Sequence, residues 1–144
     1  MSKKKSNSSA GSDLFFGSYK DRLKPILKGL FYISETDSEV VPFEINEKGP
    51  IVDQLIEGTG ADDVKLVEQV NADTFFERLS GVQDWYGEFE KIRAARFAEV
   101  YRILKAGLSD LTVYRVGRVR IEIFVVGRTV GGTLAGIKMI SVET

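Results

Sequence analysis

The sequence predicts a domain of the α+β or α/β class, in which helices pack against a β-sheet. A long helical pattern runs from residue 88 to 108, with apolar side chains at every third or fourth position. Three strand-like runs follow it, at 111–116, 119–126 and 134–142. The chain has 144 residues, of which 43% are hydrophobic, so one domain can bury a sizeable core.

The first predicted helix begins at Ser18. Asp21 stands three residues later, as in an N-terminal capping box, and apolar residues follow at helical spacing. Pro25 indicates either a start near Lys24 or a kink, because proline removes a backbone donor. Gly29 lies where a glycine can help to end a helix.

Short elements fill the next forty residues. A polar loop is predicted at 34–39, followed by a strand at 40–45. Pro42 favours an edge position for this strand, because proline cannot donate a hydrogen bond to a neighbouring strand. A helix is predicted at 51–57, after a proline, and a strand at 64–70.

Two helices and a buried strand are predicted in the remainder. Asp73 is a suitable N-cap for a helix at 74–80, and Gly107 is expected near the end of the long helix. The run from Ile121 to Val126 is apolar apart from Glu122, which predicts a central strand buried on both faces. Four later glycines fit hairpin or bulge positions, at 127, 131, 132 and 136.

The composition excludes several kinds of chemistry. The chain has no cysteine and no histidine. Disulfides, thiol catalysis, cysteine or histidine zinc sites and histidine-based nucleophile arrangements are therefore excluded. The sequence also has no glycine-rich phosphate-binding motif. No cofactor is expected.

Charge is unevenly distributed along the chain. The net charge is −1, but residues 31–73 hold eleven acidic and two basic side chains, a net of −9. Such a block suits a cationic partner or a solvated face. Asp62 and Asp63 lie within it and could hold a metal for a hydrolase, although solvated loop acids are the favoured interpretation.

The N-terminal residues 1–12 are rich in lysine and serine and are expected to form a disordered basic tail. No apolar run there is long enough for a signal peptide, and none in the sequence approaches the ~20 residues that cross a bilayer. A cytoplasmic protein without a membrane partner is therefore expected. Three lysines in a tail are too weak a signal to predict direct nucleic-acid binding.

Trp85 is the single tryptophan, and Tyr86 follows it just before the long helix. An aromatic pair at this position can anchor the core. It can also supply contact energy at a protein interface, where tryptophan and tyrosine are enriched. From the residues alone, the core is the favoured interpretation and the interface is the alternative.

Several short motifs occur in a distinctive order along the chain. They are Ser34-Glu35, Val41-Pro42-Phe43-Glu44-Ile45, Asp73-Thr74-Phe75-Phe76, Gln83-Asp84-Trp85-Tyr86, Val113-Tyr114-Arg115-Val116-Gly117, Val125-Val126-Gly127, Leu134-Ala135-Gly136-Ile137 and the final Val142-Glu143-Thr144. Together, these motifs resemble the nuclease A inhibitor family. The resemblance runs from about residue 30 to residue 144 and is densest from residue 83 onward.

The resemblance implies a fold and a function. The fold would be a three-layer α/β/α sandwich with a mixed sheet, of the pathogenesis-related protein 1 type, formed by one domain over residues 13–144. The protein would be an inhibitor and not an enzyme. Its partner would be a magnesium-dependent, sugar-non-specific nuclease, bound one to one by an inhibitor that is monomeric when free.

The resemblance also assigns three partner-binding residues. Thr144 would enter the nuclease site, where its hydroxyl would be a ligand of the target's magnesium. Magnesium prefers such hard oxygen donors, which a C-terminal threonine supplies as hydroxyl and carboxylate. Glu35 would pair with basic residues of the nuclease, and Trp85 would contact the partner.

Arg118, Arg120 and Arg128 suggest an alternative. They make the last third of the chain more basic than a protein that competes with phosphate would need to be. On this alternative, the same fold is a protein-interaction module whose partner is not a nuclease.

Overall fold

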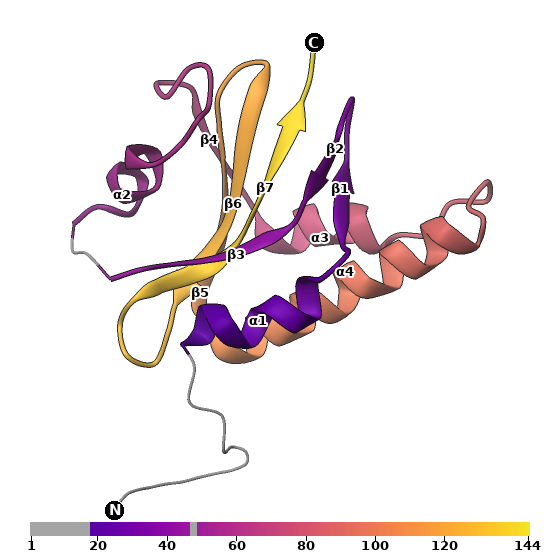
Figure 1. The fold of residues 1–144 in the computed structure, drawn as a ribbon, viewed down its shortest axis with the longest axis horizontal. Helices are drawn as coiled ribbons and strands as arrows, with labels where there is room; N and C mark the ends of the chain where they lie inside the picture. The colour runs from indigo at the N-terminus through magenta and orange to yellow at the C-terminus, as the bar shows by residue number, and fades with distance from the viewer. Residues whose placement is uncertain (1–17, 47–48) are drawn as a thin grey trace, which may run out of the picture.

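A computed structural model describes residues 18–46 and 49–144, so the predicted tail at 1–12 lies outside the described residues. A five-stranded sheet forms the centre of the molecule, in the order β3-β7-β6-β5-β4 (Figure 1). Its strands are β3 (Val41–Ile45), β4 (Val67–Val70), β5 (Ser109–Val116), β6 (Arg120–Arg128) and β7 (Leu134–Val142).

The strands pair in one sense only. Each neighbouring pair in this sheet is antiparallel, so the expectation of a mixed sheet is wrong. Tight connections at 117–119 and 129–133 join β5 to β6 and β6 to β7, and connections this short can only produce antiparallel neighbours. The prediction of a buried central strand is confirmed, since β6 has two strands on each side. The edge position that Pro42 predicts for β3 is also confirmed.

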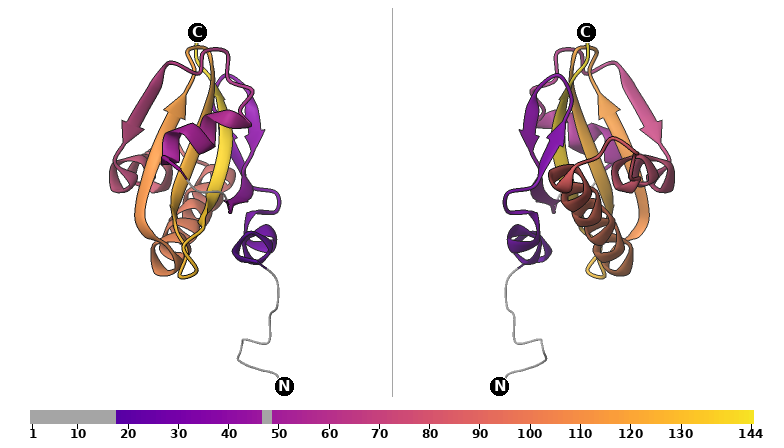
Figure 2. Two further views of the ribbon diagram at one scale, coloured as in Figure 1. Left: turned by 90° about the vertical axis from the view of Figure 1, so that its left-hand side faces the viewer. Right: turned by 90° about the vertical axis from the view of Figure 1, so that its right-hand side faces the viewer.

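Helices cover both faces of the sheet, and Figure 2 shows α2 (Ile51–Glu57) in front of one face and α4 (Glu88–Gly107) in front of the other. Leu55 of α2 joins a cluster with Phe124 of β6. Ile123, the neighbour of Phe124, points to the opposite face and packs with Phe97 of α4. The helices α1 (Tyr19–Leu27) and α3 (Ala72–Ser80) pack on that second face. The fold is therefore a mixture of helix and sheet, as predicted.

The first helix begins where the sequence predicts. The Ser18 hydroxyl accepts a hydrogen bond from the Asp21 backbone at 3.2 Å, and α1 starts at the next residue. Pro25 lies inside the helix and does not mark its start. Gly29 follows the helix with φ of +74°, a conformation that glycine adopts without strain.

The predicted polar loop at 34–39 is partly wrong. Its second half is strand β2 (Asp37–Glu39), which pairs with β1 (Phe31–Ile33) in an antiparallel hairpin. The composition of the segment is typical of a loop, and tertiary contacts with β7 override it. We call residues 31–39 the N-terminal hairpin.

Two smaller expectations also need correction. Asn71, and not Asp73, caps α3, because the Asn71 side chain accepts from the Thr74 backbone at 3.0 Å. Asp73 instead accepts a hydrogen bond from the Tyr101 hydroxyl of α4. Strand β4 begins at Val67, three residues later than predicted. None of the described helices is both long and apolar enough to cross a bilayer.

Candidate partner-binding edge

Two of the three predicted partner-binding residues touch each other. The Thr144 backbone N–H donates to Glu35 Oε2 at 2.8 Å. The Thr144 hydroxyl donates to the Glu35 carboxylate, with its oxygen 2.9 Å from Oε1 and 3.0 Å from Oε2. Both residues are exposed. Glu35 is at the tip of the N-terminal hairpin, which rises beside the end of β7 in Figure 1. The fold thus joins residues that are 109 positions apart.

Glu143, the residue before Thr144, forms an ion pair with a residue of the sheet. Its two carboxylate oxygens each lie 2.7 Å from Nη2 of Arg115 on β5. Nε of the same guanidinium lies 3.3 Å from Glu68 of β4. The Ser141 hydroxyl also donates to Glu143 at 2.7 Å. Arg115 therefore holds the end of the chain against two neighbouring strands.

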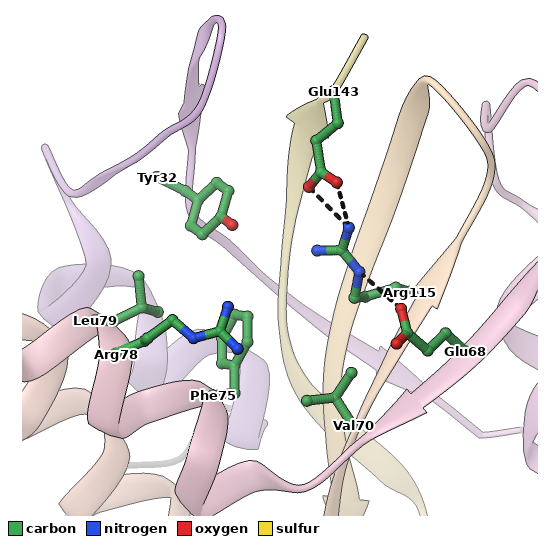
Figure 3. A pocket seen from close by; sticks show the side chains of 8 residues that line it. All are labelled: Tyr32, Glu68, Val70, Phe75, Arg78, Leu79, Arg115 and Glu143. Carbon is green, nitrogen blue, oxygen red and sulfur yellow. Dashed lines mark hydrogen bonds and ion pairs between the residues drawn. The ribbon is translucent and has the colours of Figure 1, made fainter.

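Arg115 lies at one side of a cavity of about 360 Å³ that Figure 3 shows from close by. Phe75 and Arg78 of α3 form the opposite wall, and Tyr32 of the N-terminal hairpin points in from above. Since acidic and basic side chains both line the cavity, it has no strong charge preference. No role for Glu143 is predicted from the sequence, although it is an acid beside the final residue of a basic segment and is visible there as such.

The Arg115–Glu143 ion pair predicts a dependence of stability on pH. Hydrogen bonds from Arg115, and then from Ser141, hold the pKa of Glu143 below its ordinary value of 4.5. Because the folded-state pKa is the lower one, the pair stabilises the fold above about pH 4.5, and this stabilisation is lost as the pH falls through the lowered pKa.

We expect Glu143→Gln to reduce the loss of stability between pH 6 and pH 3, measured as the urea midpoint. Glu57→Gln, at the end of α2, is the matched control, since no ion pair involves Glu57 among the described residues. A pH profile for Glu143→Gln that is as steep as that of the unmodified chain would contradict this role.

Asp62 and Asp63 hold loops together. The Asp62 carboxylate accepts the backbone N–H groups of Arg118 at 2.8 Å and of Val119 at 3.1 Å. These hydrogen bonds, the one from Arg118 foremost, lower the pKa of Asp62. Asp63 accepts from the Lys65 backbone at 3.1 Å. Within residues 18–46 and 49–144, no cluster of three or more acidic side chains is arranged to hold a metal.

The three arginines of the alternative interpretation lie at two ends of the sheet. Arg118 and Arg120 lie at the turn between β5 and β6, and Arg120 Nε donates to the Gly60 carbonyl at 3.1 Å. Arg128 lies at the opposite end of β6, 3.4 Å from the Gly132 carbonyl. They therefore do not form one basic surface.

Trp85 lies in the connection between α3 and α4, a segment that extends away from the N-terminal hairpin and the C-terminus in Figure 1. Its side chain is 73% exposed and packs edge-on against Tyr86, with ring centroids 4.7 Å apart. The interpretation of Trp85 as a core anchor is therefore wrong. Phe89 and Ile92 in the first turns of α4 are also exposed, although both belong to the apolar pattern that predicts the helix at 88–108.

Comparison with protein-family models finds a match. The family model described as "NuiA: Nuclease A inhibitor-like protein" matches residues 18–144. A search of curated proteins finds no match. The family match covers nearly the whole chain and includes both the N-terminal hairpin and the end of β7.

Proposed function

This chain belongs to the nuclease A inhibitor-like family, and from that premise we propose that it is a protein inhibitor of a nuclease and not itself an enzyme. The observation that carries the proposal to particular residues is the Glu35–Thr144 contact. It gathers a carboxylate and a hydroxyl at one edge of the sheet, where they are exposed to a partner.

The contact supports a role for the Thr144 hydroxyl as a metal ligand in the target. A hydroxyl has one proton to donate and two lone pairs that accept. The Thr144 hydroxyl donates its hydrogen bond to Glu35, so the lone pairs of the Thr144 oxygen are directed away from the carboxylate. A magnesium ion held by a nuclease prefers such an oxygen ligand. Glu35 thereby orients the group that we propose meets the metal.

Charge supports a second role for Glu35. A nuclease site is cationic because it binds phosphate. A carboxylate offers about four lone-pair positions, so Glu35 can bind Thr144 and still accept from an arginine or lysine of the target. The surrounding segment 31–73, with a net charge of −9, would speed association with a cationic surface.

We propose a magnesium-dependent, sugar-non-specific DNA and RNA nuclease as the target class, bound one to one. Such an inhibitor would protect the producer's nucleic acids in the cytoplasm. The helices on both sheet faces are compatible with the sandwich fold of the pathogenesis-related protein 1 type. The scattered positions of Arg118, Arg120 and Arg128 give no support to a partner of another class.

The proposal is tested by titrating the purified chain into a magnesium-dependent digestion of both DNA and RNA. We expect cleavage of both substrates to fall together and to reach its minimum near one inhibitor per nuclease. Undiminished cleavage by every sugar-non-specific nuclease from the source organism would reject the proposal.

Trp85 provides a second contact that can be tested separately. Because its side chain is largely exposed, Trp85→Ala should leave the free energy of unfolding nearly unchanged. If Trp85 is an anchor of the interface, inhibition should weaken about 30-fold, the loss that corresponds to a residue worth about 2 kcal/mol. Val130→Ala, a fully exposed residue in the β6–β7 turn, is the control and should inhibit normally. Normal inhibition by Trp85→Ala would remove this residue from the interface.

A further inference from the structure

We infer that Ser34 and Ser38 are positioning residues that hold the last part of β7 in place and so present Thr144 to the partner. The inference rests on the proposed function, since it concerns how the proposed inhibitory residue is placed. It assigns the N-terminal hairpin a second role, in addition to the one proposed for Glu35 at its tip.

The inference begins at the point where β7 loses a neighbouring strand. On one side, β6 pairs with β7 as far as Val142. On the other side, β3 pairs with β7 only as far as Lys138. Beyond Lys138 one edge of β7 therefore has no strand of the sheet paired with it, and the N-terminal hairpin lies there instead. Backbone N–H groups on an open edge need other acceptors, or water, and the last residues of a chain readily fray.

Side chains of the N-terminal hairpin supply these acceptors. The Ile140 N–H donates to the Ser38 hydroxyl at 2.8 Å, and the Val142 N–H donates to the Ser34 hydroxyl at 3.0 Å. The Thr144 N–H donates to Glu35 at 2.8 Å. Alternate residues of a strand direct their N–H groups to the same edge, so these three donors form a continuous series. Three side-chain oxygens replace the carbonyl groups that a neighbouring strand would provide.

The two serines occupy sites that suit this purpose. Ser38 is buried, with only 9% of its surface exposed, although both of its neighbours in β2 are exposed. Its hydroxyl is satisfied twice, since it also donates to the Glu39 carbonyl at 3.2 Å. The Ser34 hydroxyl donates to the Thr36 carbonyl at 3.3 Å, which fixes it at the tip of the hairpin. Each serine hydroxyl therefore has one hydrogen-bond partner within the hairpin and one in β7.

When a terminal segment is already ordered in the free protein, its binding to a partner loses less conformational entropy. If Thr144 were mobile, only the fraction of molecules with the right conformation could bind, and the apparent affinity would fall by that fraction. The serines contact neither the target nor its metal in this account. They act through Thr144, by keeping the strand that carries it extended and in register.

The first test uses the free protein and needs no nuclease. Amide hydrogen exchange and the ¹⁵N heteronuclear NOE are measured for the unmodified chain, Ser34→Ala and Ser38→Ala. We expect the Val142 amide in Ser34→Ala and the Ile140 amide in Ser38→Ala to exchange about tenfold faster, as the loss of one net hydrogen bond implies. The NOE of Thr144 should fall in both, while exchange at Ile123 in β6 stays the same.

Two further variants separate positioning from general stability. Ser34→Thr keeps the hydroxyl and should restore slow exchange at Val142. Ser109→Ala removes a hydroxyl that donates to the Arg128 carbonyl at the other end of β6, and should change neither measurement. Exchange at Ile140 and Val142 that is as slow in the alanine variants as in the unmodified chain would overturn the inference.

The second test measures inhibition by the Ser34→Ala/Ser38→Ala double variant. We expect it to inhibit about tenfold more weakly than the unmodified chain, since fewer molecules present Thr144 correctly. Equal inhibition by the two proteins would overturn the positioning role while leaving the proposed function intact. Failure of the unmodified chain to inhibit would instead reject the proposed function, and the exchange rates would still decide whether the serines hold the strand.

Discussion

Replacing Thr144 by valine should weaken nuclease inhibition about a hundredfold while the fold and its stability stay unchanged. Valine keeps the size and branching of threonine and removes the hydroxyl, which is the proposed ligand of the target's magnesium. It also removes the hydrogen bond to Glu35 that orients this group. A loss of this size, about 3 kcal/mol, is typical of a residue that dominates an interface. The measurement is the inhibition constant against a magnesium-dependent nuclease, with circular dichroism and the urea midpoint as folding controls.

The serine variant supplies the control for this experiment. Thr144→Ser keeps the hydroxyl and loses one methyl group, so it should inhibit within a few-fold of the unmodified chain. If both variants inhibited normally, the Thr144 hydroxyl would have no part in inhibition. If Thr144→Ser lost inhibition and Thr144→Val kept it, the methyl group would carry the contact, and the metal-ligand role would be wrong.

Glu35→Ala should weaken inhibition by about 2–5 kcal/mol, because it leaves basic groups of the target buried without a partner. It also removes the carboxylate that holds both the backbone and the hydroxyl of Thr144. Glu35→Gln separates the two effects, since it keeps an oxygen acceptor and loses the charge. We expect the glutamine variant to retain an ordered Thr144 in the free protein and to associate with the nuclease more slowly.

Asp37→Asn is the matched control for Glu35, because it removes one negative charge from the same hairpin, on a side chain that is exposed in β2. A change in association rate that is equal for Asp37→Asn and Glu35→Gln would mean that only the overall field of the hairpin matters. Full inhibition by Glu35→Ala would contradict both roles proposed for this residue.

The sequence predicts most of the sheet because the residues of its long strands favour the extended conformation that the structure has. Strands β5, β6 and β7 are long and rich in branched residues, and turn residues separate them. The N-terminal hairpin has no such pattern. Its second strand consists of Asp, Ser and Glu, and the Ser38–Ile140 contact that holds it joins residues 102 positions apart. Local propensity carries no information about such a contact.

The candidate site is predictable only in part, for the same reason. Glu35 and Thr144 follow from the resemblance to a family, but only the structure shows that the fold brings the two residues together. Ser34 belongs to one of the motifs of that resemblance, but nothing in the sequence indicates a positioning role for Ser34 or Ser38, since serine is common in loops and turns. Spacing also fails at Phe89 and Ile92, because periodicity reports which residues share a helix face and not what covers that face.

One measurement tests most directly whether the edge at Thr144 is the inhibitory surface. The same short tag is fused to either end of the chain, and the two proteins are titrated against a magnesium-dependent nuclease in parallel. Helix α1 begins at the opposite end of the molecule from Thr144 (Figure 1). We predict that the protein tagged at its N-terminus inhibits like the untagged chain and that an extension after Thr144 abolishes inhibition. Equal inhibition by the two tagged proteins would contradict the account.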